Sequence, residues 1–89
     1  MDKRKNMGGG NHRLLLVNAE QHTEKRVVAA VTTVVPGVSP DHAANCFHTA
    51  KQLGVAMITS CLKEHAEFYA HQLYARGCRT KIEPDTTTM

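Results

Sequence analysis

Apolar residues occur along the first half of the chain as one short continuous run followed by a stripe at helical spacing. The run Leu14–Val17, bounded by Arg13 and Asn18, predicts a buried strand. Thr23 can cap a helix, and the positions that repeat behind it at helical spacing are Val27, Val28, Val31, Val34 and Val35. The β-branched side chains make a strand the rival prediction, but strict alternation is absent. The pattern therefore predicts a helix that must end at Pro36-Gly37.

The second half contains two further helices, each followed by a strand. Ser39-Pro40-Asp41 supplies a capping hydroxyl, a first-turn proline and an acid, and predicts a helix that runs to Leu53 and ends at Gly54. Val55–Thr59 reads as the next strand. Residues 64–76 predict a third helix that ends at a glycine and has Ala66, Tyr69, Ala70 and Leu73 on its inner face. Cys78–Ile82 alternates with polar residues, as expected of an edge strand with one wet face.

The predicted order β-α-α-β-α-β defines the fold class. Three strands make a sheet too small to carry helices on both faces, so we expect an α+β two-layer sandwich. In it, a three-stranded antiparallel sheet packs against three helices. We assign residues 13–85 to this domain, residues 1–12 to a flexible basic and glycine-rich tail, and residues 86–89 to a disordered end.

Length, charge and cysteine content argue against several classes of protein. A chain of 89 residues forms one domain with a thin core, which suits a docking face better than a deep catalytic cleft. Much of the net charge of +3 lies in the first thirteen residues, so the domain lacks the basic, aromatic-rich face of a nucleic-acid binder. No apolar run approaches a membrane span. The three cysteines form no C-x-x-C pair and indicate buried or half-buried free thiols in a reducing compartment.

Histidines and cysteines are the only candidates for a metal site or a catalytic nucleophile. The six histidines include two pairs, His42 with His48 and His65 with His71, but a spacing of six puts the members of each pair on roughly opposite faces of a helix. We therefore expect surface histidines and no metal or cofactor. Nothing nearby in the sequence activates a cysteine as a nucleophile. The sequence thus favours a non-enzymatic binding domain.

Several stretches together resemble the ClpS family of Clp protease adaptors, over about residues 13–85. They are L-L-L-V-N, then V-P-G-V-S-P-D-H-A-A-N, G-V-A-M-I, A-E-F-Y-A-H-Q-L-Y-A-R-G and I-E-P-D. Their order and spacing agree with the predicted strands and helices, and the plant and cyanobacterial form is the most similar one.

The resemblance implies an adaptor that works without catalysis. It would bind substrate proteins whose N-terminal residue is bulky and hydrophobic (an N-degron) and deliver them to the N-terminal domain of a Clp ATPase chaperone. It further implies a monomer in the plastid stroma or the bacterial cytoplasm, with the N-terminal tail taking part in substrate transfer.

The same resemblance assigns the residues that bind the substrate's α-amine, and two of the three anchors differ here. Asn18 matches the family's Asn, but Ala19 stands at the Asp position and Lys51 at the His position; Glu20 follows where an acid also occurs. A cationic amine needs acceptors, at least one of them charged. Ala19 removes an acceptor, and Lys51 brings a charge of the same sign as the ligand.

The resemblance also assigns an apolar pocket and a chaperone contact. Val27 matches a pocket valine, Phe47 stands where Met is common, and Cys78 lies near a position usually filled by Leu. Glu64 matches an acidic position that faces the chaperone.

Three alternatives to a working N-degron adaptor remain open at this point. The chain could dock on the chaperone as a regulator without reading a free N-terminus. It could be a different interaction module of similar shape, such as the C-terminal domain of the ribosomal stalk protein, although the Lys- and Gly-rich signature of that domain is missing. A metal or thiol enzyme is the least favoured reading.

Overall fold

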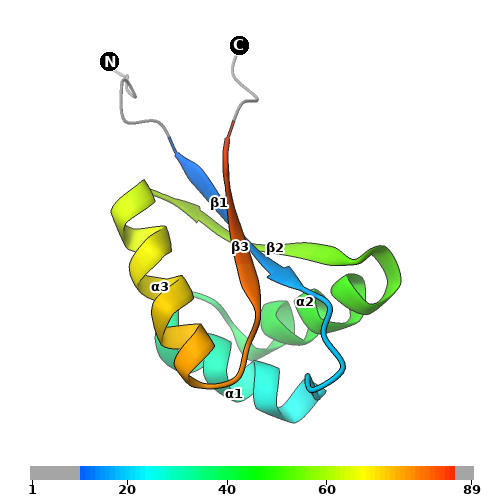
Figure 1. Cartoon of the computed structure of the whole chain (residues 1–89). Helices are drawn as coiled ribbons and strands as arrows, with labels where there is room; N and C mark the ends of the chain where they lie inside the picture. The colour runs from blue at the N-terminus through cyan, green and yellow to red at the C-terminus, as the bar shows by residue number, and fades with distance from the viewer. Residues whose placement is uncertain (1–10, 86–89) are drawn as a thin grey trace.

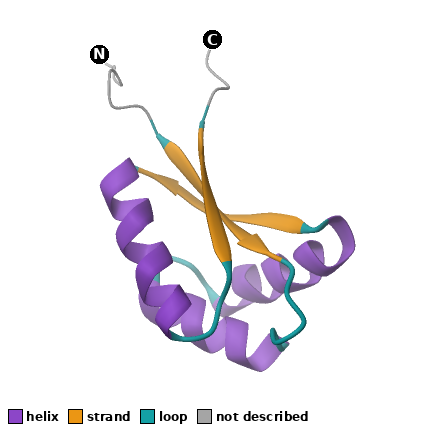
Figure 2. Cartoon of the chain, viewed as in Figure 1, coloured by secondary structure: helices purple, strands orange, loops and turns teal. Residues whose placement is uncertain are grey.

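The computed structural model describes residues 11–85, which form three strands and three helices (Figure 1). Their order is β1 (His12–Val17), α1 (Glu24–Val34), α2 (Pro40–Leu53), β2 (Val55–Cys61), α3 (Lys63–Ala75) and β3 (Thr80–Pro84). The helices gather on one side of a twisted antiparallel sheet (Figure 2). The predicted α+β two-layer sandwich is therefore confirmed.

The first strand, β1, is the centre of the sheet, whose strand order is β2-β1-β3. Leu15 is opposite Met57 on one side and Lys81 on the other. The pairing with β3 is regular, whereas the pairing with β2 has a bulge between Leu14 and Leu15. Both β2 and β3 are consequently edge strands, and they differ in whether side chains cover the backbone groups of their outer edges.

Aliphatic side chains from the sheet and from all three helices fill the space between the two layers. Leu14 and Leu16 of β1 are fully buried beneath the helices, together with Val31 of α1 and Leu73 of α3. The valine stripe of α1 belongs to this core, as its helical spacing predicts. No helix within residues 11–85 is long and apolar enough to cross a membrane.

Helix caps explain why the helical boundaries are predicted well. The hydroxyl of Thr23 accepts from the N–H of Arg26, and that of Ser39 accepts from the N–H of His42. Gly54 ends α2 with a left-handed φ of 94°, a conformation that side-chain-bearing residues rarely adopt.

The strand boundaries differ from the predicted ones by two residues. β1 begins at His12 and β2 extends to Cys61, because both continue past the apolar residues that predict them. The prediction of a last strand over 78–82 is wrong at its start. The N–H of Cys78 donates to the carbonyl of Leu73 at the end of α3, so that residue stays in the connection and β3 begins at Thr80.

Candidate functional site

The end of β1 and the end of α2 meet at the site that the sequence assigns to substrate binding. The N–H of Asn18 donates to the carbonyl of Gly54 over 3.0 Å, and Gly54 is the C-cap of α2. Lys51 lies in the last turn of that helix. Two of the three predicted amine anchors, Asn18 and Lys51, are thus placed at the same end of the molecule.

Ala19, the third anchor, opens a tight turn. Its carbonyl accepts from the N–H of His22 over 3.1 Å, which leaves Glu20 and Gln21 at the two central positions of the turn. Both central side chains are exposed. Within the described residues, no ion pair joins Glu20 to Lys51, so the Glu20 carboxylate is available to an incoming cation.

His22 closes this turn and corrects the expectation that all six histidines lie on the surface. Its side chain is only 5% exposed, and its Nε2 accepts from the N–H of Arg79 over 2.9 Å. The carbonyl of Arg79 accepts in turn from the N–H of Val17. This backbone-to-ring bond, which fixes the Asn18 turn against the start of β3, joins residues far apart in sequence, so no local pattern signals it.

The surroundings of His22 include two cations. Burial lowers the pKa of this imidazole below its ordinary value of 6.5, and the charges of Arg79 and Lys51 lower it further. His22 is therefore neutral at physiological pH, which suits its role as an acceptor. Arg79 and Lys51 carry a charge of the same sign as an ammonium group.

Lys51 is exposed, and its Nζ lies over the ring of Phe47, 5.5 Å from the ring centroid. The imidazole of His48 meets the same ring edge-on at 5.2 Å. His48 also contacts Glu24 at the start of α1, Nε2 to Oε1, over 3.2 Å. Side chains of α1 and α2 thus close around Phe47.

The three side chains assigned to the apolar pocket are packed into the core. Val27 is fully buried, Cys78 is 1% exposed and Phe47 is 7% exposed. Burial raises the pKa of the Cys78 thiol, with a smaller opposing effect from the charge of Arg26.

Glu64 occupies a different region, the first turn of α3, and is exposed. Two large apolar side chains near it are also exposed: Phe68, one turn along the helix, is 59% exposed, and Leu62, at the N-cap, is 48% exposed. Neither Leu62 nor Phe68 stands out in the apolar pattern of the sequence, although the spacing of Glu64 and Phe68, i and i+4, places them on one helix face.

No group of three or more His, Cys, Asp or Glu side chains in residues 11–85 could hold a metal ion. All three cysteines are free: Cys46 and Cys78 are buried and Cys61 is partly buried, as predicted. Burial raises the pKa of each thiol. A raised pKa lowers the thiolate fraction and makes these groups weak nucleophiles.

Comparisons with known proteins identify the family. No family model matches the sequence. The chain is 60% identical over 88 residues to the chloroplastic Clp protease adapter protein CLPS2 of Chlamydomonas reinhardtii, covering 99% of this chain but only 52% of that relative. It is 32% identical over 74 residues to the adapter protein ClpS of Synechococcus elongatus, covering 83% of this chain and 78% of that one. These relatives are named adapters of a protease, which agrees with a non-enzymatic domain.

A solved structure has the same fold. It is that of Agrobacterium tumefaciens ClpS2 bound to L-phenylalaninamide, with a TM-score of 0.80 at 20% identity, covering 88% of this chain and all of that one. The chain spans about half the length of the Chlamydomonas relative, and its matches to the cyanobacterial adapters extend over most of their length. The protein therefore belongs to the ClpS family of ATP-dependent Clp protease adapter proteins.

Proposed function

We propose that this chain delivers protein substrates to a Clp ATPase chaperone, in a plastid or in a cytoplasm of the cyanobacterial type. The observation that supports this most is the meeting of the Asn18 turn with the last turn of α2, fixed by the bond between Asn18 and Gly54. These are the two segments that the family resemblance assigns to substrate binding. The chloroplastic and cyanobacterial relatives support the location.

The substrate feature proposed first is a free N-terminus with a bulky apolar residue. Asn18 offers a side-chain carbonyl and Glu20 an exposed carboxylate, so the two can supply a neutral and a charged acceptor for an ammonium group. Phe47 would reshape the apolar pocket relative to the methionine common in the family, because an aromatic ring is larger and stiffer.

The second candidate is docking on the chaperone without recognition of classical N-degrons. It is favoured by the burial of Val27, Phe47 and Cys78, the three side chains assigned to the apolar pocket, and by the cation Lys51 at the position of an amine anchor. In this case α3 would act alone, through Glu64 and the exposed Phe68.

A peptide titration separates the two candidates. Fluorescent peptides that begin with Phe, Leu, Tyr or Trp are titrated with the protein, and the same peptides with an acetylated N-terminus serve as the control. Binding of the free peptides alone supports the N-degron adaptor. Absence of binding by every peptide, with chaperone binding retained, rejects it in favour of the docking regulator.

Chaperone docking is tested on the N-terminal domain of a Clp ATPase by calorimetry. We expect Glu64→Lys to abolish or strongly weaken binding. Asp41→Lys is the matched control, because Asp41 is also an exposed first-turn acid but begins α2. If the wild-type chain does not bind the ATPase at all, both candidates fail.

A further inference from the structure

The two outer edges of the sheet differ in whether side chains cover their backbone groups, and the edge of β2 is covered. The thiol of Cys46 donates to the carbonyl of Met57 over 3.3 Å, and Nε2 of His42 lies 2.9 Å from the carbonyl of Ile58. Both side chains come from α2. The bulge opposite Leu14 also falls in this stretch. Side-chain caps and bulges are common ways to stop an edge strand from pairing further.

The edge of β3 has no such cover among the described residues. The carbonyl of Arg79 accepts from Val17, and the N–H of Asp85 donates to Asn11. In a regular antiparallel ladder the residues of this parity, from Arg79 to Asp85, face β1. The backbone groups of Thr80 and Ile82 must therefore face outward, away from the sheet.

The side chains along β3 have a self-complementary order of charge. The segment reads R-T-K-I-E-P-D from residue 79 to residue 85. Two cations precede Ile82 and two acids follow it at the same separations. When such a strand pairs antiparallel with a copy of itself about Ile82, every charged residue meets one of opposite sign. Lys81 then lies opposite Glu83 of the second copy, and Arg79 opposite Asp85.

We propose that β3 is a homodimer interface, in which two chains pair antiparallel through this edge about Ile82 and form one continuous sheet. Ile82 exchanges both of its backbone hydrogen bonds with Ile82 of the second copy, and the N–H of Thr80 donates to the carbonyl of Pro84. Lys81 and Glu83 become a directly opposed cross-strand pair, the arrangement in which opposite charges stabilise a sheet. Within one chain these two side chains already contact each other over 3.1 Å, so they can join in a four-membered charge network across the axis.

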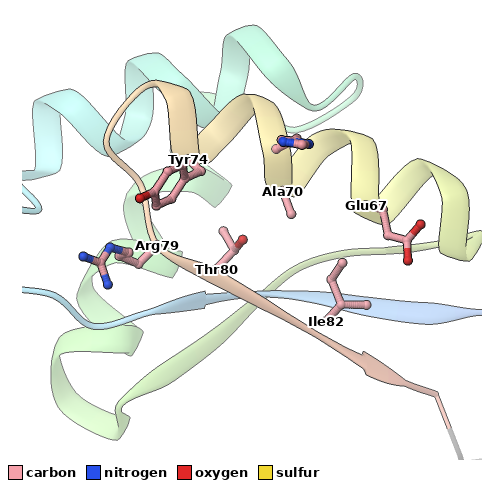
Figure 3. A pocket seen from close by; sticks show the side chains of 7 residues that line it. Glu67, Ala70, Tyr74, Arg79, Thr80 and Ile82 are labelled. Carbon is pink, nitrogen blue, oxygen red and sulfur yellow. The ribbon is translucent and has the colours of Figure 1, made fainter.

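The groove beside β3 provides the space and additional surface for this pairing. It has a volume of about 530 Å³ and lies between α3 and β3, where the side chains of Thr80 and Ile82 point toward the helix (Figure 3). Tyr74, which is 68% exposed, lies at the Arg79 end of this groove and Glu67 at the other. A two-fold rotation about Ile82 turns the grooves of both copies toward one another.

The expected dimer is weak and forms reversibly with concentration. Pro84 has no N–H and cannot donate to Thr80 of the second copy, which removes hydrogen bonds from the pairing. Lysine and proline on edge strands commonly oppose self-association. In this register, however, Lys81 lies opposite an acid instead of another lysine. The charge of Lys81 therefore favours this register over registers in which two lysines would repel each other.

The test is sedimentation equilibrium of the full chain from about 10 μM to 1 mM, with two single-charge variants. Wild-type protein should rise from the monomer mass of 9.8 kDa toward twice that value. Lys81→Glu places two acids opposite each other and Glu83→Lys two lysines, so each variant should dimerise about tenfold more weakly. An equimolar mixture of the two variants restores both opposite-charge pairs and should regain the wild-type association.

Ser60→Glu, on the covered edge strand, is the control and should leave the association unchanged. Thermal unfolding of each variant confirms that it is folded, since Glu83 also contacts Arg13 over 3.4 Å. A wild-type chain that remains at 9.8 kDa at 1 mM overturns the proposal and restores the expected monomer. A dimer that both single variants form as well as wild type, or a mixture that associates no better than either variant alone, also overturns it by assigning the contact to another surface.

Discussion

The Asn18–Lys51 side of the molecule and the exposed face of α3 differ in how deeply the residues assigned to binding are buried. On the first side, the residues assigned to recognition are largely core residues: Val27, Phe47 and Cys78 are buried, and His22 links the turn to β3. On the second, Glu64 and Phe68 are exposed. Substitutions on the first side should therefore affect folding as well as any binding there, whereas substitutions on the second should cost little stability.

Truncation of one phenylalanine on each side gives the largest expected difference. Phe47→Ala removes a buried ring and should lower the free energy of unfolding by about 3 kcal/mol or more. Phe68→Ala removes a ring that is 59% exposed and should change it by less than about 0.5 kcal/mol. Urea denaturation at 25 °C measures both values.

The same two variants should have the reverse order in chaperone binding. Phe68→Ala weakens binding to a Clp ATPase N-terminal domain because the ring lies one turn from Glu64, whereas Phe47→Ala leaves it unchanged if the protein remains folded. Equal losses of stability for the two variants would show that the two sides do not differ as described.

His22 should make the stability of the recognition side depend on pH. Its pKa is lower in the folded protein than the ordinary 6.5, so the unfolded state binds the proton more readily. The contribution of neutral His22 is complete above pH 6.5 and is lost as the pH falls through the lower folded value. His22→Leu and His22→Gln should both reduce the loss of stability between pH 7.5 and 5, as measured by urea denaturation across that range.

The two variants differ in what they leave for the N–H of Arg79. Leucine cannot accept a hydrogen bond, so His22→Leu should cost about 1–3 kcal/mol at pH 7.5, whereas His22→Gln keeps an acceptor and should cost less. A pH dependence identical to that of wild type in both variants would remove His22 from this role.

Local sequence signals were sufficient to predict the helices and the order of helices and strands along the chain. The hydroxyls of Thr23 and Ser39 and the left-handed Gly54 act within a few residues of the boundaries that they set. The start of β3 was misplaced because the hydrogen bond of Cys78 to Leu73 is a property of the helix end, which the apolar pattern does not show. The fold class can therefore be predicted from local signals, whereas the exact ends of the strands depend on contacts that those signals do not show.

The site was predicted less completely because its decisive contacts are tertiary. The family resemblance assigns Asn18 and Lys51 to one site, and in the structure Asn18 contacts Gly54, the residue that ends the helix of Lys51. The burial of His22 depends on Arg79, which is 57 positions away in sequence. Likewise, the contact of Lys51 with the Phe47 ring and the burial of that ring depend on how α2 packs against the rest of the domain. The sequence therefore showed which residues differ from the family pattern but not that Phe47 is buried.

Substitution of Lys51 should change binding on one side only. Lys51→His replaces a permanent cation with a group that can accept, and should tighten binding of a peptide with N-terminal Phe by about tenfold at pH 7.5. Its affinity for the chaperone domain should not change, because the proposed chaperone contact lies on α3. Fluorescence anisotropy gives the first value and calorimetry the second. A variant that binds the peptide no better than wild type would indicate that the closed apolar pocket, rather than the charge of Lys51, limits recognition.

Thiol alkylation perturbs the protein least, because it compares the accessibility of the two sides through the native cysteines and needs no substitution. Cys61 is partly exposed at the end of β2, next to α3, whereas Cys78 is buried under the recognition side. Burial raises the pKa of both thiols, so each reacts slowly, but only Cys78 must wait for a local opening. With iodoacetamide at pH 8, Cys61 should be modified at least about tenfold faster than Cys78, as followed by peptide mass spectrometry. A bound N-terminal Phe peptide should slow Cys78 further and leave Cys61 unaffected. If Cys78 reacts as fast as Cys61, the recognition side opens as readily as the surface of α3, and its apolar pocket is accessible despite its packing.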